Sequence, residues 1–167
     1  DHSPVINADE TLLIFTSRRE GSTGGELAYD GEYYEDIYYS RRIGEHWSQP
    51  RPISPNINTP GHEASIGLSP DGQRLYIYKD DKGDGNIYMS ILRDEWTKPV
   101  KLPEPINSKA FETHASATPD GSMLYFTSDR KGGYGGLDIY RVRRLPNGDW
   151  GKAENLGPVI NTERNEE

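Results

Sequence analysis

The chain contains no cysteine. This absence excludes a disulfide framework and thiolate metal sites, and both oxidising and reducing compartments permit such a chain. Long apolar runs are also missing, since a membrane-spanning helix needs about 20 apolar residues. No basic segment followed by an apolar segment appears at Asp1, so we expect any targeting signal or anchor to lie outside this sequence. We therefore predict no membrane span in this segment.

Positive charge is in deficit. There are 19 Lys and Arg against 27 Asp and Glu, which gives a net charge of −8. Such a chain repels a phosphate backbone, so we predict no nucleic-acid binding. Only 32% of the 167 residues are hydrophobic, whereas there are 18 Gly and 12 Pro. This composition predicts one turn-rich domain rather than a helical bundle.

What the chain does contain is a repeat. "SPDGQRLYIY" begins at Ser69 and the closely similar "TPDGSMLYFT" begins at Thr118. A third copy opens the chain, with Asp9 in the place of Asp71, and its additional residues all fall in "REGSTGGELAYDGEYYED", which ends at Asp36. Each copy continues to a Trp that is followed 11 positions later by an Asn. We predict three units, at about residues 1–62, 63–111 and 112–165.

Each unit reads as four strands. In the second unit "EASIGLS" and "QRLYIYK" flank the turn Pro70-Asp71-Gly72, in which Pro presets φ and Gly tolerates a positive φ. "NIYMSILR" and "WTKPVKL" follow, and Pro99 places the last of them at an edge. Four short antiparallel strands in about 50 residues, repeated, indicate the blades of an all-β β-propeller.

These segments resemble the WD-like repeats of TolB-type β-propellers. They are most similar to the copies in OmpA-family proteins of Gram-negative envelopes, including PorE-like components of the type IX secretion machinery. The resemblance covers essentially the whole chain, although the first unit has "NADE" where the second has "SPDG". It implies a periplasmic module that binds proteins and associates with the outer membrane through other domains of the parent protein. No part of the sequence matches an OmpA domain or helical repeats.

Residues that recur in every unit are more simply part of the scaffold, because a catalytic residue is needed only once. We expect Leu75, Tyr76, Leu124 and Tyr125 to form the core between blades. Residues that recur in register are also expected to be scaffold, namely Asp1, Glu63, Glu112 and Glu166 at one position and Asp36, Asn86 and Asp138 at another. The first set alternatively forms a carboxylate ring near the axis, which would hold a cation or a basic group of a partner.

Three tryptophans recur as well. Trp47, Trp96 and Trp150 read first as apolar plugs between blades, and alternatively as platforms for sugar rings.

Known metal and phosphate motifs are not matched. The four histidines (His2, His46, His62 and His114) lie at non-equivalent positions of the repeat. "KDDKGDGN", residues 79–86, lacks the ligand order of a calcium loop, and a tight acidic turn fits it better. "RKGGYGGLD" precedes a strand rather than a helix, so it is not a phosphate loop. We predict no metal site and no cofactor.

Two classes of function fit a propeller of this kind. One is a non-enzymatic module that binds a protein or peptide of the cell envelope. The other is a glycan-active or glycan-binding propeller with axial carboxylates, and a catalytic pair would lie about 5 to 9 Å apart. The expected inner strands "SPVIN", "ASIGLS" and "HASATP" carry no acidic residue beyond the repeated Glu. We therefore predict binding, with no catalytic residues.

The binding face is expected where the loops entering the first strand meet those joining the second strand to the third. Such a face mixes aromatic, basic and acidic groups, as interfaces do. Its expected members are Arg19, His62, Glu63, Asp80, Phe111, Glu112, His114, Arg130 and Tyr134.

Two further expectations concern the long insert and the number of blades. The segment "GSTGGELAYDGEYYED" shows no strand alternation, which predicts a mobile, solvent-facing loop. Three blades would leave two apolar faces uncovered, whereas closed propellers have about four or more blades. We therefore expect either a longer propeller or self-association of two copies through their open edges into a six-bladed ring.

Overall fold

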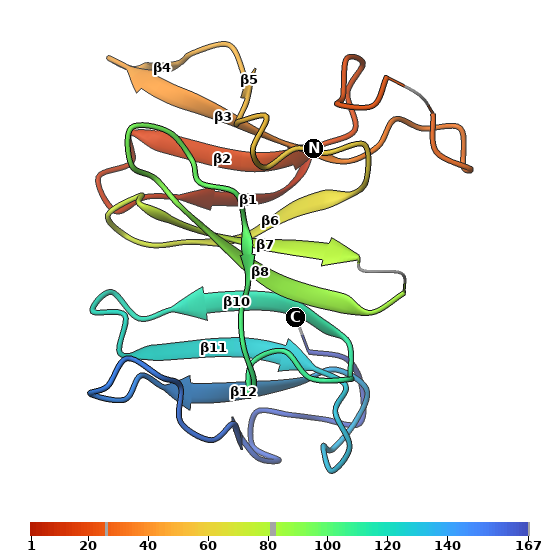
Figure 1. Ribbon diagram of the computed structural model, residues 1–167, viewed down its shortest axis with the longest axis vertical. Helices are drawn as coiled ribbons and strands as arrows, with labels where there is room; N and C mark the ends of the chain where they lie inside the picture. The colour runs from red at the N-terminus through yellow and green to blue at the C-terminus, as the bar shows by residue number, and fades with distance from the viewer. Residues whose placement is uncertain (26, 81–82, 167) are drawn as a thin grey trace.

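A computed structural model describes residues 1–25, 27–80 and 83–166. These residues form thirteen strands and no helix, in agreement with the all-β prediction. The strands make three antiparallel sheets that follow one another along the chain (Figure 1). Nowhere in the described ranges is there a helix long and apolar enough to cross a membrane.

The second and third sheets are meanders in which successive strands pair, and in the first sheet the fifth strand pairs with the third instead of the fourth. The boundaries predicted at residues 62 and 111 fall in the loops between sheets. The first sheet comprises β1 (His2–Ile6), β2 (Leu12–Ser17), β3 (Asp36–Ile43), β4 (His46–Trp47) and β5 (Arg51–Pro52), and β4 and β5 both pair with β3. The second comprises β6 (Glu63–Leu68), β7 (Arg74–Asp80), β8 (Gly85–Ile91) and β9 (Val100–Lys101). The third comprises β10 (Glu112–Ala117), β11 (Met123–Ser128), β12 (Asp138–Arg143) and β13 (Glu154–Asn155).

The repeated Asp-Gly turns close the first hairpin of the second and third sheets. Gly72 and Gly121 have φ of +70° and +67°, which is the conformation that glycine tolerates best. Asp120 accepts hydrogen bonds from the Thr118 hydroxyl (2.6 Å) and from the backbone N–H of Ser122 (3.0 Å). These bonds, the Thr118 one first, lower the pKa of Asp120 to about 2. The turn that the repeat predicts is therefore confirmed.

The asparagine of each repeat unit takes over backbone pairing where the fourth strand is short. The Asn107 amide oxygen accepts from the backbone N–H of Ile87 at 2.8 Å, and its nitrogen donates to the Ile87 carbonyl at 2.7 Å. Asn58 bonds in the same way to Ile37, and Asn161 to Ile139. The side chain thus satisfies two buried backbone groups.

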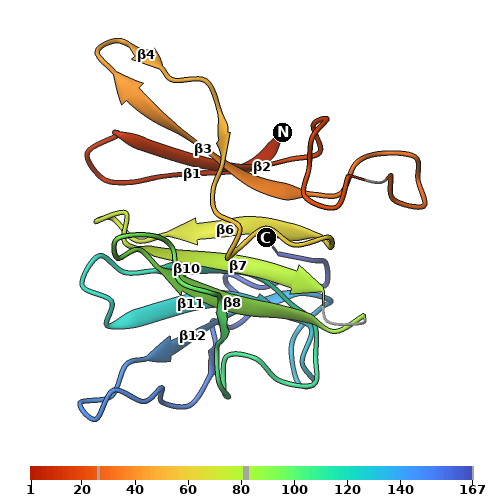
Figure 2. The same cartoon turned by 45° about the horizontal axis from the view of Figure 1, so that its top comes forward.

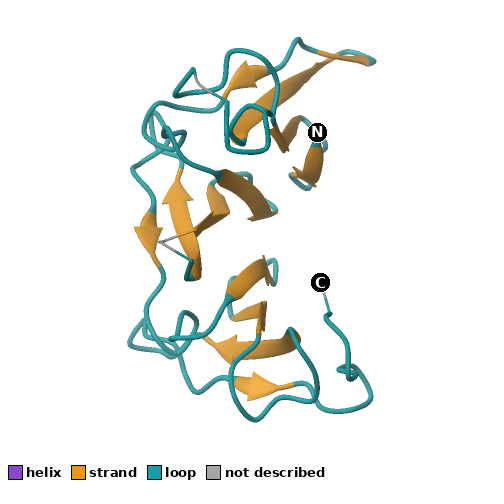
Figure 3. Ribbon diagram, turned by 90° about the vertical axis from the view of Figure 1, so that its right-hand side faces the viewer, coloured by secondary structure: helices purple, strands orange, loops and turns teal. Residues whose placement is uncertain are grey.

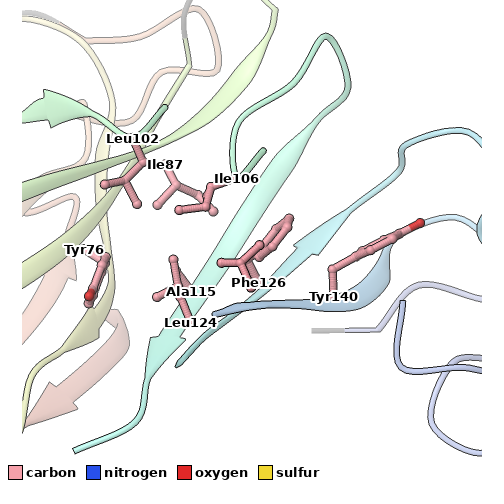
Figure 4. Close-up of a cluster of buried hydrophobic side chains, with 9 residues drawn as sticks. Tyr76, Ile87, Leu102, Ile106, Ala115, Leu124, Phe126 and Tyr140 are labelled. Carbon is pink, nitrogen blue, oxygen red and sulfur yellow. The ribbon is translucent and has the colours of Figure 1, made fainter. Parts of the chain in front are cut away.

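Two hydrophobic clusters join the sheets. One lies between the second and third sheets and combines Tyr76, Ile87, Leu102 and Ile106 with Ala115, Leu124, Phe126, Tyr140 and Val142 (Figure 4). The other lies between the first and second sheets and combines Leu12, Ile14, Ile37, Ile53 and Ile57 with Leu75, Ile77 and Trp96. The core prediction is therefore confirmed for Leu75, Tyr76 and Leu124.

Two predicted core residues are not buried. Tyr125 is only half-buried, and Trp47 remains 41% exposed although Trp96 at the equivalent place is 7% exposed. The plug prediction thus holds for Trp96, and Trp150 is half-buried against the cluster of the second and third sheets. Trp47 belongs to neither of the two hydrophobic clusters.

The three sheets fan around one open side (Figure 3). β6 contacts β1 on one side and β10 on the other, so the first strands of the sheets lie side by side. The insert between β2 and β3 extends beyond the sheets, on the side away from the hairpin turns (Figures 1 and 2). It contains one isolated bridge, between Leu27 and Tyr33, so it is not wholly without backbone pairing.

Candidate functional site

One end of the three sheets carries all nine predicted binding residues, and we call it the insert end. It consists of residues 1–2, 18–36, 59–63, 79–86, 108–114, 128–138 and 162–166, of which Glu26, Asp81 and Lys82 lie outside the described residues. The opposite end holds the turns at residues 8–11, 70–73 and 119–122. The strand register places these ends, since Glu112 pairs with Ser128 and Ser128 pairs with Asp138.

A buried glutamate begins the second sheet. Glu63 is fully buried, and its two oxygens accept from the backbone N–H of Thr59 (2.9 Å) and from the Thr59 hydroxyl (2.5 Å). Lys79 on β7 places its Nζ 2.8 Å from Oε1. A buried carboxylate is stable only with such partners. Glu63 therefore links β6 to the segment that leaves the first sheet.

Glu112 does the same at the start of the third sheet. It accepts from the Ser108 N–H (3.1 Å), the Ser108 hydroxyl (2.8 Å) and the Ser128 hydroxyl (2.7 Å). Its cation is Arg130, at 3.1 Å. The prediction that the repeated glutamates are scaffold thus describes both side chains. Neither carboxylate faces an open axial ring, because each is enclosed by its own donors.

Arg130 also donates hydrogen bonds to backbone carbonyls, in addition to its ion pair with Glu112. Its Nη1 donates to the Pro105 carbonyl at 2.9 Å and its Nη2 to the Ile106 carbonyl at 2.7 Å, both in the segment that leaves the second sheet. The guanidinium also lies over two aromatic rings, 4.8 Å from the centroid of Phe126 and 4.9 Å from that of Tyr140. With only 17% of its side chain exposed, Arg130 acts mainly as a staple between two sheets.

A cluster with two histidines sits where the insert meets the second sheet. Glu35 lies 3.2 Å from His2 Nε2 and 3.3 Å from His62 Nδ1, one carboxylate oxygen to each ring. The Tyr34 ring lies 4.8 Å from that of His62. Of these four residues the sequence pointed only to His62. Tyr34 and Glu35 were missed because the insert has no repeat equivalent against which they could be compared, and His2 because its partner Glu35 lies in that insert.

The insert presents an anchored tip. Arg18 forms a two-pronged ion pair with Asp30, both distances being 2.9 Å, and donates from Nε to the Tyr33 carbonyl at 2.7 Å. The bonds from Arg18 hold the pKa of Asp30 below its ordinary value. Between these anchors Leu27 is 54% exposed and Tyr29 is fully exposed. The sequence identified the loop but did not predict that these two side chains are exposed on it.

Asp36 fixes the base of the insert. It is fully buried, and its Oδ2 accepts from the Thr23 N–H (2.7 Å) and the Thr23 hydroxyl (2.8 Å). Its Oδ1 has no hydrogen-bond partner among the described residues. Burial, opposed in part by the bonds from Thr23, raises the pKa of Asp36.

No known family model matches the chain, and no curated protein matches it. Solved structures do. TolB from Acinetobacter baumannii superposes with a TM-score of 0.57 at 19% identity, over 94% of this chain and 32% of that one. A structure assigned to TolB from Agrobacterium tumefaciens superposes with a TM-score of 0.63 at 21% identity, over 95% of this chain and 46% of that one.

The fold is that of a TolB-like β-propeller. The chain spans a third to a half of the length of those structures, and its three sheets form part of such a propeller. The predicted propeller class and the TolB resemblance are therefore confirmed at the level of the fold.

In this TolB-like propeller the predicted binding residues divide into two groups. Glu63, Glu112 and Arg130 are engaged between sheets, as described above. The more accessible members are Arg19, His62, Asp80, Phe111, His114 and Tyr134, of which Tyr134 is 51% exposed. Phe111 packs against the Tyr78 ring at 5.9 Å, and Arg19 bonds Asp1 at 2.9 Å.

Glu63 and Glu112, the repeated carboxylates of the inner strands, are both ion-paired and enclosed. Within the described ranges no group of three or more His, Cys, Asp or Glu side chains is arranged to hold a metal ion. The turn predicted for residues 79–86 includes Asp81 and Lys82, which lie outside the described residues; beside them the Gly83 N–H donates to the Asp80 carboxylate at 2.6 Å.

Proposed function

We propose that this TolB-like propeller is a non-enzymatic module that binds a protein or peptide through the insert end. The observation that carries the proposal is the display of Tyr29 and Leu27 from a loop whose flanks are fixed by Arg18 and Asp36. Exposed aromatic and apolar side chains on an anchored frame lose little conformational entropy on binding and commonly act as interface anchors.

Charge indicates the chemistry of the partner. Glu20, Glu32 and Asp80 are exposed at the insert end, and the whole chain carries a net charge of −8. A polypeptide with basic side chains around an apolar or aromatic anchor complements this surface, and unlike charges also accelerate encounter. Tyr134, His62, Phe111 and His114 extend the proposed contact region over the second and third sheets.

We place the module in the cell envelope, in the periplasm. The support is the resemblance of its repeats to those of OmpA-family and PorE-like proteins, together with the TolB-like fold. In this proposal other domains of the parent protein supply association with the outer membrane. Fractionation of the native cells tests the location: the protein is expected with the periplasmic or outer-membrane fraction, and its recovery in the cytoplasm contradicts the proposal.

Site-specific photo-crosslinking tests the binding face. A photoreactive residue at position 29 or 134 is expected to capture the same envelope protein, whereas one at Leu145, which is 38% exposed and follows β12, is expected to capture none. The double variant Leu27→Ala, Tyr29→Ala should weaken binding of the captured partner roughly 100-fold and leave the melting temperature unchanged. Equal capture from both ends of the molecule contradicts a specific insert-end interface.

A further inference from the structure

A group of arginines lies on the outer part of the first sheet, at the end of β3 opposite to the insert (Figure 1). The insert precedes β3, whereas Arg41 and Arg42 lie near the last residue of this strand. Arg51 on β5 pairs with Tyr39 of β3. In a chain with a net charge of −8, these three arginines form a local region of positive charge.

The arginines line a groove of about 580 Å³. A volume of this size is typical of sites for small molecules. No described Asp or Glu side chain lines the groove, which therefore combines positive charge with one aromatic ring, one aliphatic side chain and a hydroxyl. The residues concerned are Arg41, Arg42, Arg51, Tyr39, Ile43 and Ser48.

Two of the three arginines have no acidic partner. Neither Arg41 nor Arg51 forms an ion pair with a described residue, whereas Arg42 pairs with Glu10 at 3.3 Å. The Arg41 Cζ lies 5.7 Å from the centroid of the Tyr39 ring, a contact that limits the motion of the guanidinium. Tyr39 pairs with Arg51 and lies two residues from Arg41, so these three side chains share one face of the sheet.

This face of the first sheet is the one that contacts the second sheet. Ile37, two residues before Tyr39, belongs to the hydrophobic cluster between these sheets, and Tyr39 packs against that cluster. A smaller cavity of about 260 Å³ shares Tyr39 and Arg41 with the groove and is also lined by Asp94 and Glu95 of the second sheet. The tyrosine and its two flanking arginines therefore owe their arrangement to the first sheet and its contact with the second.

The equivalent positions of the other two sheets differ. In the second sheet Met89, Ile91 and Val100 replace the tyrosine and the two flanking arginines, in that order. In the third sheet Arg141 takes the place of the tyrosine and Glu154 that of the last arginine, and these two side chains form an ion pair at 3.0 Å. The first sheet therefore differs from both others in combining arginines at this place with no carboxylate.

We propose that this groove binds a phosphomonoester, with the phosphate between Arg41 and Arg51 and the attached sugar or headgroup beside Tyr39 and Ile43. A guanidinium donates two parallel hydrogen bonds to phosphate oxygens. A phosphomonoester carries close to two negative charges at neutral pH, so it gains more from two arginines than a single carboxylate does. Gln49 also lines the groove and offers an amide to hydroxyl groups of the ligand.

An acidic polypeptide fits the groove less well. Pro50 and Pro52 flank Arg51, and proline has no N–H group with which an extended chain at this edge of the sheet would pair. The groove also lies at the end of β3 opposite to the insert, so this binding is separate from the protein interface proposed above. The variant Leu27→Ala, Tyr29→Ala should therefore bind the phosphomonoester unchanged.

Calorimetric titration of the purified chain with glucose 6-phosphate at low salt tests the proposal. The expected dissociation constant is on the order of 0.1 to 1 mM and rises with ionic strength, and glucose should not bind. Arg41→Ile and Arg51→Val introduce the residues of the second sheet at these positions, and each should weaken binding roughly 10-fold. Circular dichroism confirms that both variants are folded.

Lys98→Gln is the matched control. It also removes one positive charge, but Lys98 does not line the groove, and Gln49 occupies the equivalent position two residues after the Trp of the first unit. Its affinity should equal that of the unaltered chain. Conversely, the double variant Asp94→Asn, Glu95→Gln removes the two carboxylates of the adjoining cavity and should tighten binding roughly 3-fold.

A second experiment distinguishes the source of the phosphate. Co-sedimentation with vesicles of phosphatidylcholine and phosphatidic acid, lost in the variant Arg41→Ile, Arg51→Val, would identify a lipid headgroup, whereas binding of glucose 6-phosphate alone would identify a soluble sugar phosphate. Binding to neither ligand, or a loss with Lys98→Gln as large as with the arginine variants, overturns the proposal. Equal binding of glucuronate, or tighter binding of a hexaglutamate peptide, overturns the choice of a phosphomonoester.

Discussion

We call the interface between the first and second sheets the first joint, and that between the second and third sheets the second joint. The two joints bury apolar surface with different side chains. The first is almost wholly aliphatic around Trp96, and the second is built on the stacked rings of Phe126 and Tyr140, whose centroids lie 5.9 Å apart. The first also has hydrogen bonds that join the first strands and the first turns of its two sheets. Ser65 donates to the Ser3 carbonyl at 2.9 Å, and the Ala8 N–H donates to the Pro70 carbonyl at 2.8 Å.

The cations that bind the two buried glutamates, which we call latches, also differ between the joints. Lys79 reaches only the carboxylate of Glu63, whereas Arg130 reaches Glu112 and two carbonyls of the preceding segment. Because a guanidinium offers five donors in a planar fork, one arginine replaces several separate ties. The comparison teaches that the second joint concentrates its stability in a few side chains and the first joint distributes it.

Truncation at equivalent core positions should break the joints unequally. Phe126→Ala is expected to lower the free energy of unfolding by about 4 kcal/mol, and Ile77→Ala, at the same place in the first joint, by about 3 kcal/mol. Urea unfolding at one fixed protein concentration measures both. An equal loss would contradict the idea that the second joint depends more on single side chains.

Removal of the arginine latch should come next in size. Arg130→Ala leaves the buried Glu112 carboxylate without its cation and is expected to cost about 3 kcal/mol. Arg130→Lys keeps a cation, as Lys79 does for Glu63, and should cost about 1 kcal/mol. Thermal unfolding at pH 7 compares the two variants, and a lysine variant as unstable as the alanine variant would show that the carbonyl contacts, rather than the charge, hold the joint.

Asp36→Asn sharpens the comparison, since Asn86 already occupies this position in the second sheet. Because burial raises the pKa of Asp36 in the folded state, deprotonation destabilises the protein as pH rises from 3.8 through that higher value. The variant should therefore gain about 1 kcal/mol at pH 7 and nothing below pH 3.8. Melting curves across pH test this, and a constant difference at all pH values contradicts it.

The smallest effect is expected at the turn that precedes β11. The pKa of Asp120 lies at about 2 in the folded state, below its ordinary 3.8, so its stabilisation is present above pH 3.8 and is lost as pH falls towards 2. Asp120→Asn should lower the melting temperature slightly at pH 7 and flatten its fall between these two pH values. An unchanged acid profile would show that the turn hydrogen bonds contribute nothing to stability.

Much of the fold was predictable because its signals are local. The Asp71-Gly72 and Asp120-Gly121 turns, the short strands beside them and the Trp-to-Asn distance all depend on residues near one another in the chain. The scaffold role of Glu63 and Glu112 followed from their recurrence. The exposed state of Leu27 and Tyr29 was not predictable, because it depends on how Arg18 and Asp36 anchor a loop that occurs only once.

The sequence by itself determined that three similar four-stranded units stack, since each unit repeats the apolar side chains that only a neighbour can bury. Only the tertiary structure decided which of these side chains are covered and which cation completes each latch. Lys79 and Arg130 serve equivalent glutamates from positions that do not align in the repeat, because Lys79 matches Ser128 in register. The path of the backbone around each glutamate decides which cation reaches it, and that path is a property of the fold rather than of spacing along the chain.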